Sequence, residues 1–298
     1  MAGTTSKVKL PRSVVTELLP KVKDNSVIAT LCANKPQTFN ENETIVFTPT
    51  AEAEVVEEGA KKGSYEIATG FVSGVRVKVQ TTTRVTEELK WADEDDRLEI
   101  ISNIQADQAG AIGRALDYVT IHGINPATKA ALAAKYTHLT GMEGIHEVVS
   151  GASETDNIDA MLETLIDWEF NGIALSRKYA SDLRKLRVPS TMARLYPEIP
   201  LNLEVGSFEG LRAATSATVN GRLAKTPTGI RAIMGNFDLI KWGMVRDMTA
   251  EIIEYGDPDQ TGVDLKANGQ IAYRTQAVFS YGILDAGGFC VLRDKGVE

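Results

Sequence analysis

The stretch "DEDDRLEIISNIQADQAGAIGRALDYVTIHG", residues 93–123, is the most periodic part of the sequence. Its apolar residues recur at helical spacing: Leu98, Ile101, Ile104, Ile112, Leu116 and Val119. Acidic residues at its start suit the positive end of a helix dipole, and Gly123 suits a helix end. The pattern predicts a helix of about 28 residues, roughly 42 Å long, where the mean is about 12 residues. We expect such a helix to lie across an extended body.

Two runs of alternating residues precede this helix, at Thr44–Val56 and at residues 70–85. In the second run Val75, Val77 and Val79 share one face, and charged or polar residues share the other. We predict that the two runs pair as a long two-stranded ribbon. Its tip, "VVEEGAKKGSYEIATG" at residues 55–70, is longer and more charged than a hairpin turn requires. An isolated ribbon is marginally stable in water, so this one needs a partner surface.

The rest of the chain predicts an α+β fold. Residues 1–40 form an arm with one apolar patch, "SVIATLCAN". After the long helix comes a surface excursion, and from Asp156 helices and strands alternate, which indicates a compact mixed α/β domain. In that domain "DNIDAMLETLIDWEF" predicts a helix capped by aspartate, and "GIALS", residues 172–176, predicts a short buried strand. The apolar face of the predicted helix consists of Ile158, Met161, Leu162, Leu165 and Ile166. The stretch "QIAYRTQAVFSYGILDAGGFCVL", residues 270–292, predicts a long closing strand.

Composition and motifs argue against catalysis, metals and cofactors. The formal charge is -8, with 40 acidic and 32 basic residues, which disfavours nucleic-acid binding as the main task. His122, His138 and His146 match no zinc pattern, and the two cysteines, Cys32 and Cys290, predict buried thiols. The stretch "DPDQTGVD", residues 257–264, resembles the start of a calcium loop, but Asn268 stands where the bidentate glutamate belongs. We therefore predict a turn there, no cofactor, and no enzyme. No signal peptide or membrane helix is predicted either.

The order of these parts resembles the major capsid proteins of tailed double-stranded DNA phages, which have the Hong Kong 97-type fold. Three stretches carry the resemblance. "AEVVEEGAKKGSYEIATGFVSGVRVKV", residues 53–79, resembles the extended loop of the family, and "NIQADQAGAIGRALDYVTIHGINPAT", residues 103–128, resembles its spine helix. Residues 229–289, from "GIRAIMGNF" to "ILDAGGF", resemble its closing region. No single short motif is diagnostic, whereas the ordered set is fairly specific.

The resemblance implies a division into an N-terminal arm (1–37), an extended loop (38–92), a peripheral domain with the spine helix (93–145), an axial domain (146–261) and a closing peripheral strand (262–298). It implies a head protein that assembles as hexamers and pentamers into an icosahedral shell around the genome. The implied partners are copies of itself, a portal protein, a separate scaffolding protein and a decoration protein. Packaged DNA is enclosed without sequence-specific binding, no membrane is involved, and the virion protein assembles in the host cytoplasm.

Candidate inter-subunit contacts follow from the ribbon: Glu57, Glu58, Lys61, Lys62, Val75, Val77 and Val79. Some relatives cut away an N-terminal scaffolding segment, but here the arm begins at Met1, so we expect no such cleavage. Some relatives also form Lys–Asn isopeptide bonds aided by a glutamate. Lys61, Lys62 and Asn268 are the nearest equivalents, yet Thr275 and Gln276 stand where the carboxylate is expected. We therefore predict no covalent cross-links.

Two alternatives remain open from the sequence. An encapsulin-type compartment would use the same fold to hold protein cargo in place of a genome. A soluble α/β enzyme built on residues 156–260 would need a pocket with perturbed acids or bases, for which the sequence offers no strong candidate.

Overall fold

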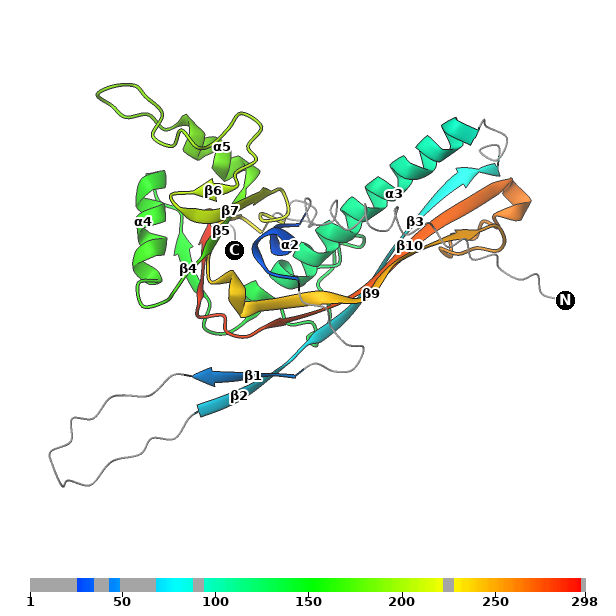
Figure 1. The fold of residues 1–298 in the computed structure, drawn as a ribbon, viewed down its shortest axis with the longest axis horizontal. Coiled ribbons are helices and arrows are strands. Elements are labelled where there is room, and N and C mark those ends of the chain that lie inside the picture. Colours follow the sequence, from blue (N-terminus) through cyan, green and yellow to red (C-terminus); the bar gives the residue numbers. More distant parts are fainter. Residues whose placement is uncertain (1–25, 35–42, 49–67, 88–93, 222–227, 296–298) are drawn as a thin grey trace.

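The long helix forms as the periodicity predicts. The computed structural model describes residues 26–34, 43–48, 68–87, 94–221 and 228–295. In it, α3 spans Glu94–Asp117 and continues as a π-helical turn at Tyr118–His122. The helix ends at Gly123, whose φ of 62° is a left-handed conformation that glycine adopts without strain. Figure 1 shows α3 running from the body of the molecule along a long sheet.

That sheet has the strand order β3-β10-β9 and is antiparallel. Its strands are β3 (Val75–Thr86), β9 (Ile240–Ile253) and β10 (Gln270–Ile283). The predicted pairing of the ribbon is therefore wrong for β3, because β3 pairs along its whole length with the closing strand β10. The sequence pattern placed the three valines on one face correctly: Val77 is buried, Val75 and Val79 are half-buried, and the residues between them are exposed.

A shorter ribbon does form, from β1 (Glu43–Thr48) and β2 (Ala68–Ser73). The two strands pair only with each other, and their register runs from Glu43 opposite Ser73 to Thr48 opposite Ala68. Figure 1 shows this pair projecting from one side of the body, with β2 leading into β3, and β2 contacts β10 at its base. Among the described strands, the ribbon forms a two-stranded sheet of its own.

A six-stranded mixed sheet forms the second body of the molecule, with the strand order β4-β11-β8-β5-β7-β6. Its strands are β4 (His146–Val149), β5 (Gly172–Ser176), β6 (Ser207–Phe208), β7 (Leu211–Ser216), β8 (Ile230–Gly235) and β11 (Phe289–Arg293). The sequence pattern missed β4, which lies in the predicted surface excursion. It predicted the fully buried β5 correctly.

Two helices cover one face of this sheet, α4 (Glu154–Thr164) and α5 (Arg177–Lys185). Serine caps both of them, because the hydroxyl of Ser153 accepts from the Asp156 amide and that of Ser176 accepts from the Tyr179 amide. The predicted aspartate cap of α4 is therefore wrong. Both helices bury apolar residues in a core that they share with the alternate residues of β5, β8 and β11.

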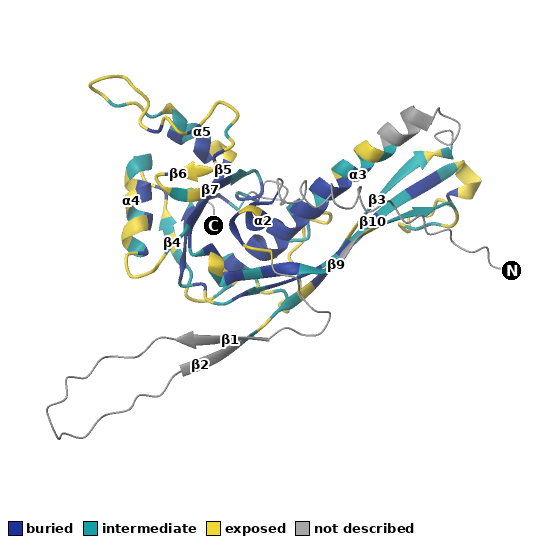
Figure 2. Ribbon diagram, viewed as in Figure 1, coloured by how far each residue is buried: buried dark blue, intermediate teal, exposed yellow. Residues whose placement is uncertain are grey.

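The opposite face of the same sheet meets the rest of the chain. The short helix α2 (Val27–Leu31) packs there with the end of α3 and with residues of β3 and β10. The apolar patch of the arm therefore belongs to the main core. Figure 2 shows this buried region at the centre, while exposed residues lie on α4 and on the loop after α5.

Candidate assembly surfaces

One carboxylate joins three distant parts of the chain. Asp117, at the end of α3, has no exposed surface. Its oxygens accept from the Ser26 hydroxyl at 2.5 Å, the Val27 amide at 3.0 Å, the Ile28 amide at 3.1 Å and the Thr218 hydroxyl at 2.5 Å. Burial raises its pKa, while these hydrogen bonds act in the opposite direction. The arm, the spine helix and the loop after β7 are thus held at one point.

His122 reinforces the same junction one turn further along. Its Nε2 lies 2.8 Å from the carbonyl oxygen of Thr218, so the neutral ring donates from Nε2. Its Nδ1 is buried with no hydrogen-bond partner in the described part of the chain. Burial lowers the pKa of His122 to about 4, because a second proton would have to be held without compensation. Thr218 therefore binds Asp117 through its hydroxyl and His122 through its carbonyl oxygen.

A buried glutamine ties α3 to the long sheet. The Gln108 amide donates to the Thr83 hydroxyl on β3 and to the Tyr273 carbonyl on β10, both at 3.0 Å. Its carbonyl oxygen accepts from the Thr275 hydroxyl. The Thr275 hydroxyl thus helps to anchor the helix on the sheet.

An arginine organises the loop after β9. The Arg84 guanidinium on β3 binds the carboxylates of Asp257 and Asp259 and donates to the Val263 carbonyl at 3.1 Å. Arg84 lowers the pKa of Asp259 to about 2. The aspartates that resemble a calcium loop thus surround a guanidinium, and the loop forms the turn that the sequence predicted.

Another arginine cross-links the six-stranded sheet to its helices. Arg231 on β8 donates to the Ser150 hydroxyl at 2.6 Å and pairs with Glu154 at 2.7 Å and Asp182 at 3.3 Å. Its guanidinium also lies over the Tyr179 ring, 4.8 Å from the centroid. These buried polar groups satisfy one another, so the cluster offers no unpaired group for substrate chemistry.

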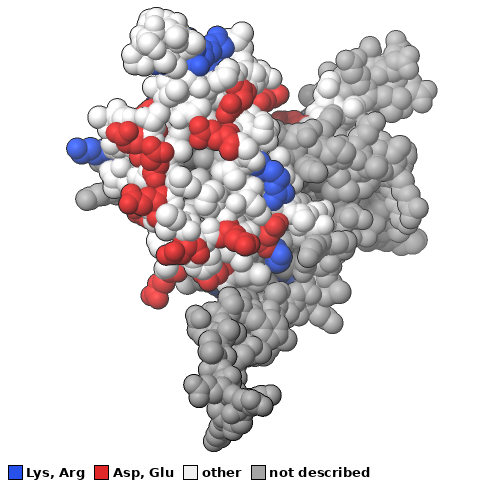
Figure 3. All heavy atoms as spheres, turned by 60° about the vertical axis from the view of Figure 1, so that its left-hand side comes forward, with Lys and Arg blue, Asp and Glu red and all other residues white. Residues whose placement is uncertain are grey.

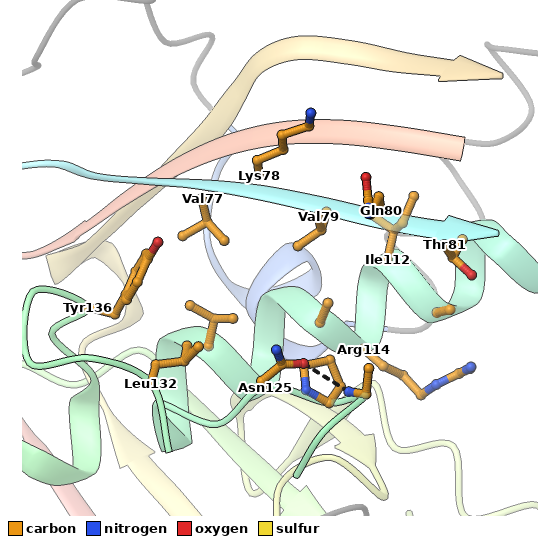
Figure 4. A pocket seen from close by; sticks show the side chains of 15 residues that line it. Val77, Lys78, Val79, Gln80, Thr81, Ile112, Arg114, Asn125, Leu132 and Tyr136 are labelled. Atoms are coloured by element: carbon orange, nitrogen blue, oxygen red, sulfur yellow. Dashed lines mark hydrogen bonds between the residues drawn. The ribbon is translucent and has the colours of Figure 1, made fainter. Parts of the chain in front are cut away.

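A groove of about 580 Å³ lies between β3, α3 and the segment after the spine helix (Figure 4). Figure 4 shows Val77 near Tyr136 and Leu132 at one end of the groove, Val79 in the middle and Ile112 toward the other end. The walls are mainly apolar, with Lys78, Arg114 and Gln80 also along the groove. Its lining contains no grouping of acid, base and nucleophile, so its chemistry suits an apolar segment better than a reaction.

The outer surface of α4 and of the loop after α5 carries exposed apolar side chains. They include Leu162, Ile166, Met192, Leu195 and Leu201. Leu162 and Ile166 were predicted as part of the apolar face of α4, but only Ile158, Met161 and Leu165 of that face are buried. Figure 3 shows many acidic side chains on the same side of the molecule. Large apolar residues among charges are typical of surfaces that meet another protein.

The predicted contact residues fall into two groups. Glu57, Glu58, Lys61 and Lys62 lie outside the described residues. Val75, Val77 and Val79 pack against the core of their own chain, and Val77 and Val79 also line the groove. The sequence pattern missed Asp117 and Gln108. One signal in the sequence could have indicated them, namely a polar residue within or beside the apolar stripe of a helix. Gln108 shares that stripe with Ile112 and Leu116, and Asp117 follows Leu116 directly.

Within the described ranges, no group of histidine, cysteine or carboxylate side chains could hold a metal ion. Cys32 and Cys290 are both buried as free thiols, and burial raises the pKa of each. None of the helices described is long and apolar enough to cross a membrane.

Comparisons with solved structures give the family. A capsid structure of Mycobacterium phage Ogopogo is 31% identical, covers 99% of this chain and 94% of its own, and has a TM-score of 0.78. A capsid structure of Gordonia phage Cozz is 26% identical over 91% of this chain and 87% of its own, with a TM-score of 0.75. The capsid of a native gene transfer agent particle shares the fold, at 13% identity over 99% and 95% of the two chains and a TM-score of 0.57.

No family model matches the sequence, and no curated protein does. The structural neighbours do not favour the compartment or the enzyme alternative. They are subunits of shells, and a shell is built from copies of its subunit, so they indicate that this chain assembles with copies of itself. With 31% identity over nearly the whole length of both chains, the protein belongs to the major capsid proteins of tailed phages with the Hong Kong 97-type fold.

Proposed function

We propose that this subunit assembles as hexamers and pentamers into an icosahedral head that encloses double-stranded DNA. The observation that carries the proposal is the β1–β2 ribbon, whose strands pair only with each other in the described chain. A two-stranded ribbon gains stability by packing against another surface. In a shell, that surface is supplied by the next copy.

The groove between β3 and α3 is a candidate seat for a neighbouring copy. Its apolar walls at Val77, Val79 and Ile112 would bury apolar surface of an incoming segment, and desolvated apolar surface dominates stable interfaces. We divide the chain according to the same shell architecture. The parts are the arm (1–37), the extended loop (38–92), the peripheral regions (93–145 and 262–298) and the axial domain (146–261), which faces the centre of the capsomer.

The remaining partners follow from assembly of such a head in the host cytoplasm. A portal protein would occupy one vertex, a separate scaffolding protein would guide assembly, and a decoration protein would bind the finished surface. The subunit itself would have no enzymatic activity. Its net negative charge suits DNA that is enclosed without being held in place, because like charges do not adsorb.

Imaging of the purified protein by negative-stain microscopy tests the proposal. Closed particles tens of nanometres across, with six-fold and five-fold clusters, are expected. A chain that stays monomeric under all solution conditions, with no particles in the cells that produce it, would contradict the proposal. Particles filled with protein cargo instead of DNA would assign the subunit to a cellular compartment.

A further inference from the structure

We infer that neighbouring copies meet head to tail through two oppositely charged flanks of the second body. This inference rests on the proposed function and names the surfaces that a capsomer would use. The acidic flank consists of the exposed carboxylates on and after α4: Asp156, Asp159, Glu163, Asp167 and Glu169. The basic flank consists of the exposed cations on and after α5: Arg177, Lys178, Lys185, Arg187 and Arg194.

The two flanks are strongly segregated in charge. Residues 154–170 contain no lysine or arginine, and residues 177–195 contain Asp182 as their single acid. Asp182 is occupied within the chain, where it pairs with Lys185 at 2.8 Å and with Arg231 at 3.3 Å. Among the ion pairs formed by described residues, none joins one flank to the other. Lys185 is thus occupied within the chain, and the other charges of the flanks form no ion pair among the described residues.

The two flanks lie on different helices, which meet at the start of α4, where Arg231 binds both Glu154 and Asp182. Both helices pack on the same face of the six-stranded sheet, but α4 covers β4 and β11 at one edge, while α5 covers β5, β7 and β8. Figure 1 shows α4 upright at the left of this body and α5 across its top. Figure 3 shows the acidic side chains spread over the side that lies at the left in Figure 1. One copy thus presents its acidic flank around α4 and its basic flank around α5.

Each flank also carries apolar anchors. Ile166 is 74% exposed and Leu162 is 46% exposed on the acidic flank. Met192 is 71% exposed in the loop of the basic flank, and Leu195 lies close by in sequence with 38% exposure. Apolar side chains surrounded by charged ones form the usual core and rim of a protein interface. Charge on the rim selects the partner and the register, while the apolar centre supplies most of the stability.

A second copy satisfies this arrangement when its basic flank meets the acidic flank. Pairing of like flanks would place acid against acid or base against base, which opposes association. Pairing of the acidic flank with the basic flank of the next copy can repeat around a rotation axis and close a ring, and the rings of the proposed function select this arrangement over a two-fold dimer that pairs the flanks crosswise. The partner is therefore another copy of this chain, placed as in a cyclic capsomer.

Charge reversal on each flank tests the inference. The variants are Glu163→Lys with Asp167→Lys on the acidic flank, and Lys178→Glu with Arg187→Glu on the basic flank. Lysines near the C-terminal end of α4 and a glutamate in the first turn of α5 suit the helix dipoles, so these changes spare folding. Thermal unfolding of the subunits verifies this. At low salt each variant is expected to lower particle yield about tenfold or more, because like charges then face each other.

The protein with all four substitutions is the matched control, because it restores opposite charges at every contact and the original net charge. Its particle yield is expected to return to within about twofold of the wild-type yield. Unchanged yields of the two reversed variants, or a combined variant no better than either of them, would overturn the inference and leave the proposed function intact. A wild-type chain that forms no particles would instead overturn the proposed function.

Mixing the two reversed variants distinguishes head-to-tail contacts from any other partner. An alternating ring of the two places opposite charges at every contact, but only when the number of subunits is even. Hexamers and hexamer sheets or tubes are therefore expected from the mixture, and pentamers and closed heads are not. Closed heads at wild-type yield, or no rescue of hexamers at all, would contradict the head-to-tail contact.

Discussion

At Asp117 a single carboxylate without any exposed surface accepts four hydrogen bonds from the arm and from the loop after β7. A hydrogen bond to a charged carboxylate is stronger than one between neutral groups, and a donor left unpaired in the core costs free energy. The neighbouring His122 adds a bond to the same loop. These two residues make the junction of arm, helix and sheet depend on a few polar atoms.

Replacing Asp117 by asparagine tests that dependence. Asparagine replaces one carboxylate oxygen by an NH2 group, which donates, while all four neighbouring groups are donors too. We therefore expect the free energy of unfolding to fall by about 2 to 3 kcal/mol. Denaturant unfolding of the unassembled subunit measures the loss. Asp107→Asn is the control, since Asp107 is exposed on the same helix. A loss at Asp117 no larger than the loss at Asp107 would contradict the assigned role.

His122 predicts a pH dependence with a defined sign. Its pKa in the folded protein is about 4, below the ordinary value of 6.5. Above pH 6.5 the ring is neutral in both states. As the pH falls from 6.5 to about 4 the unfolded chain binds a proton that the folded one does not, so about 3 kcal/mol of stability is lost.

The matched variant is His122→Gln, whose side-chain amide can still donate to the Thr218 carbonyl but does not titrate. Unfolding free energies measured between pH 7 and pH 4 should fall more steeply for the wild type than for this variant. Parallel curves for the two proteins would show that His122 is not the group responsible.

At the scale of elements, the fold of β3 explains what its valines do. Val77 is 7% exposed and packs in the main core, and the strand pairs with β10 along its length. The same strand forms one wall of the groove. The face that the sequence assigned to an inter-subunit contact therefore supports the subunit itself, and its contact with a neighbour stays a prediction.

Replacing Val75, Val77 and Val79 together by serine should lower particle yield more than replacing Lys61 and Lys62 by glutamine. Removal of a buried valine costs about 2 kcal/mol or more at Val77 alone, whereas solvated ion pairs of lysine contribute about 0 to 1 kcal/mol each. Particle yield and subunit unfolding are measured for both variants. Equal yields would show this ranking to be wrong.

Local patterns predicted the elements better than their partners. The apolar period of α3, the cluster of buried residues in β5 and the alternation of β3 are all properties of neighbouring residues, and each element formed where it was predicted. The partner of β3 lies nearly 200 residues away in β10, so no local pattern could identify it. Strand β4 was missed because its four residues alternate too briefly to stand out from the loop around them.

The same distinction between a local pattern and its distant partners applies to the polar residues of α3. The apolar stripe of α3 was readable, but the roles of Gln108 and Asp117 depend on Thr83, Thr275, Ser26 and Thr218, which reach the helix only through the fold. Exposure of Ile166 likewise depends on where the helix α4 ends, at Thr164, and on the absence of a covering layer among the described residues.

At the scale of the whole molecule, the shell should be held by packing and charge without covalent links between subunits. Thr275 and Gln276 offer no carboxylate as a general base, and Thr275 is 1% exposed with its hydroxyl bonded to Gln108. We expect boiled particles to run as a single band of subunit mass on a denaturing gel. A ladder of covalent oligomers would contradict this expectation.

The central claim is that copies of this chain, by themselves or with a scaffold, close into a shell through the ribbon and the two flanks. Electron cryomicroscopy of particles formed by the full chain tests it most directly. The account predicts closed icosahedral particles in which the β1–β2 ribbon of each subunit lies over the next subunit and the α4 flank faces a neighbouring α5 flank. A compact monomer whose ribbon folds back on its own core would contradict it.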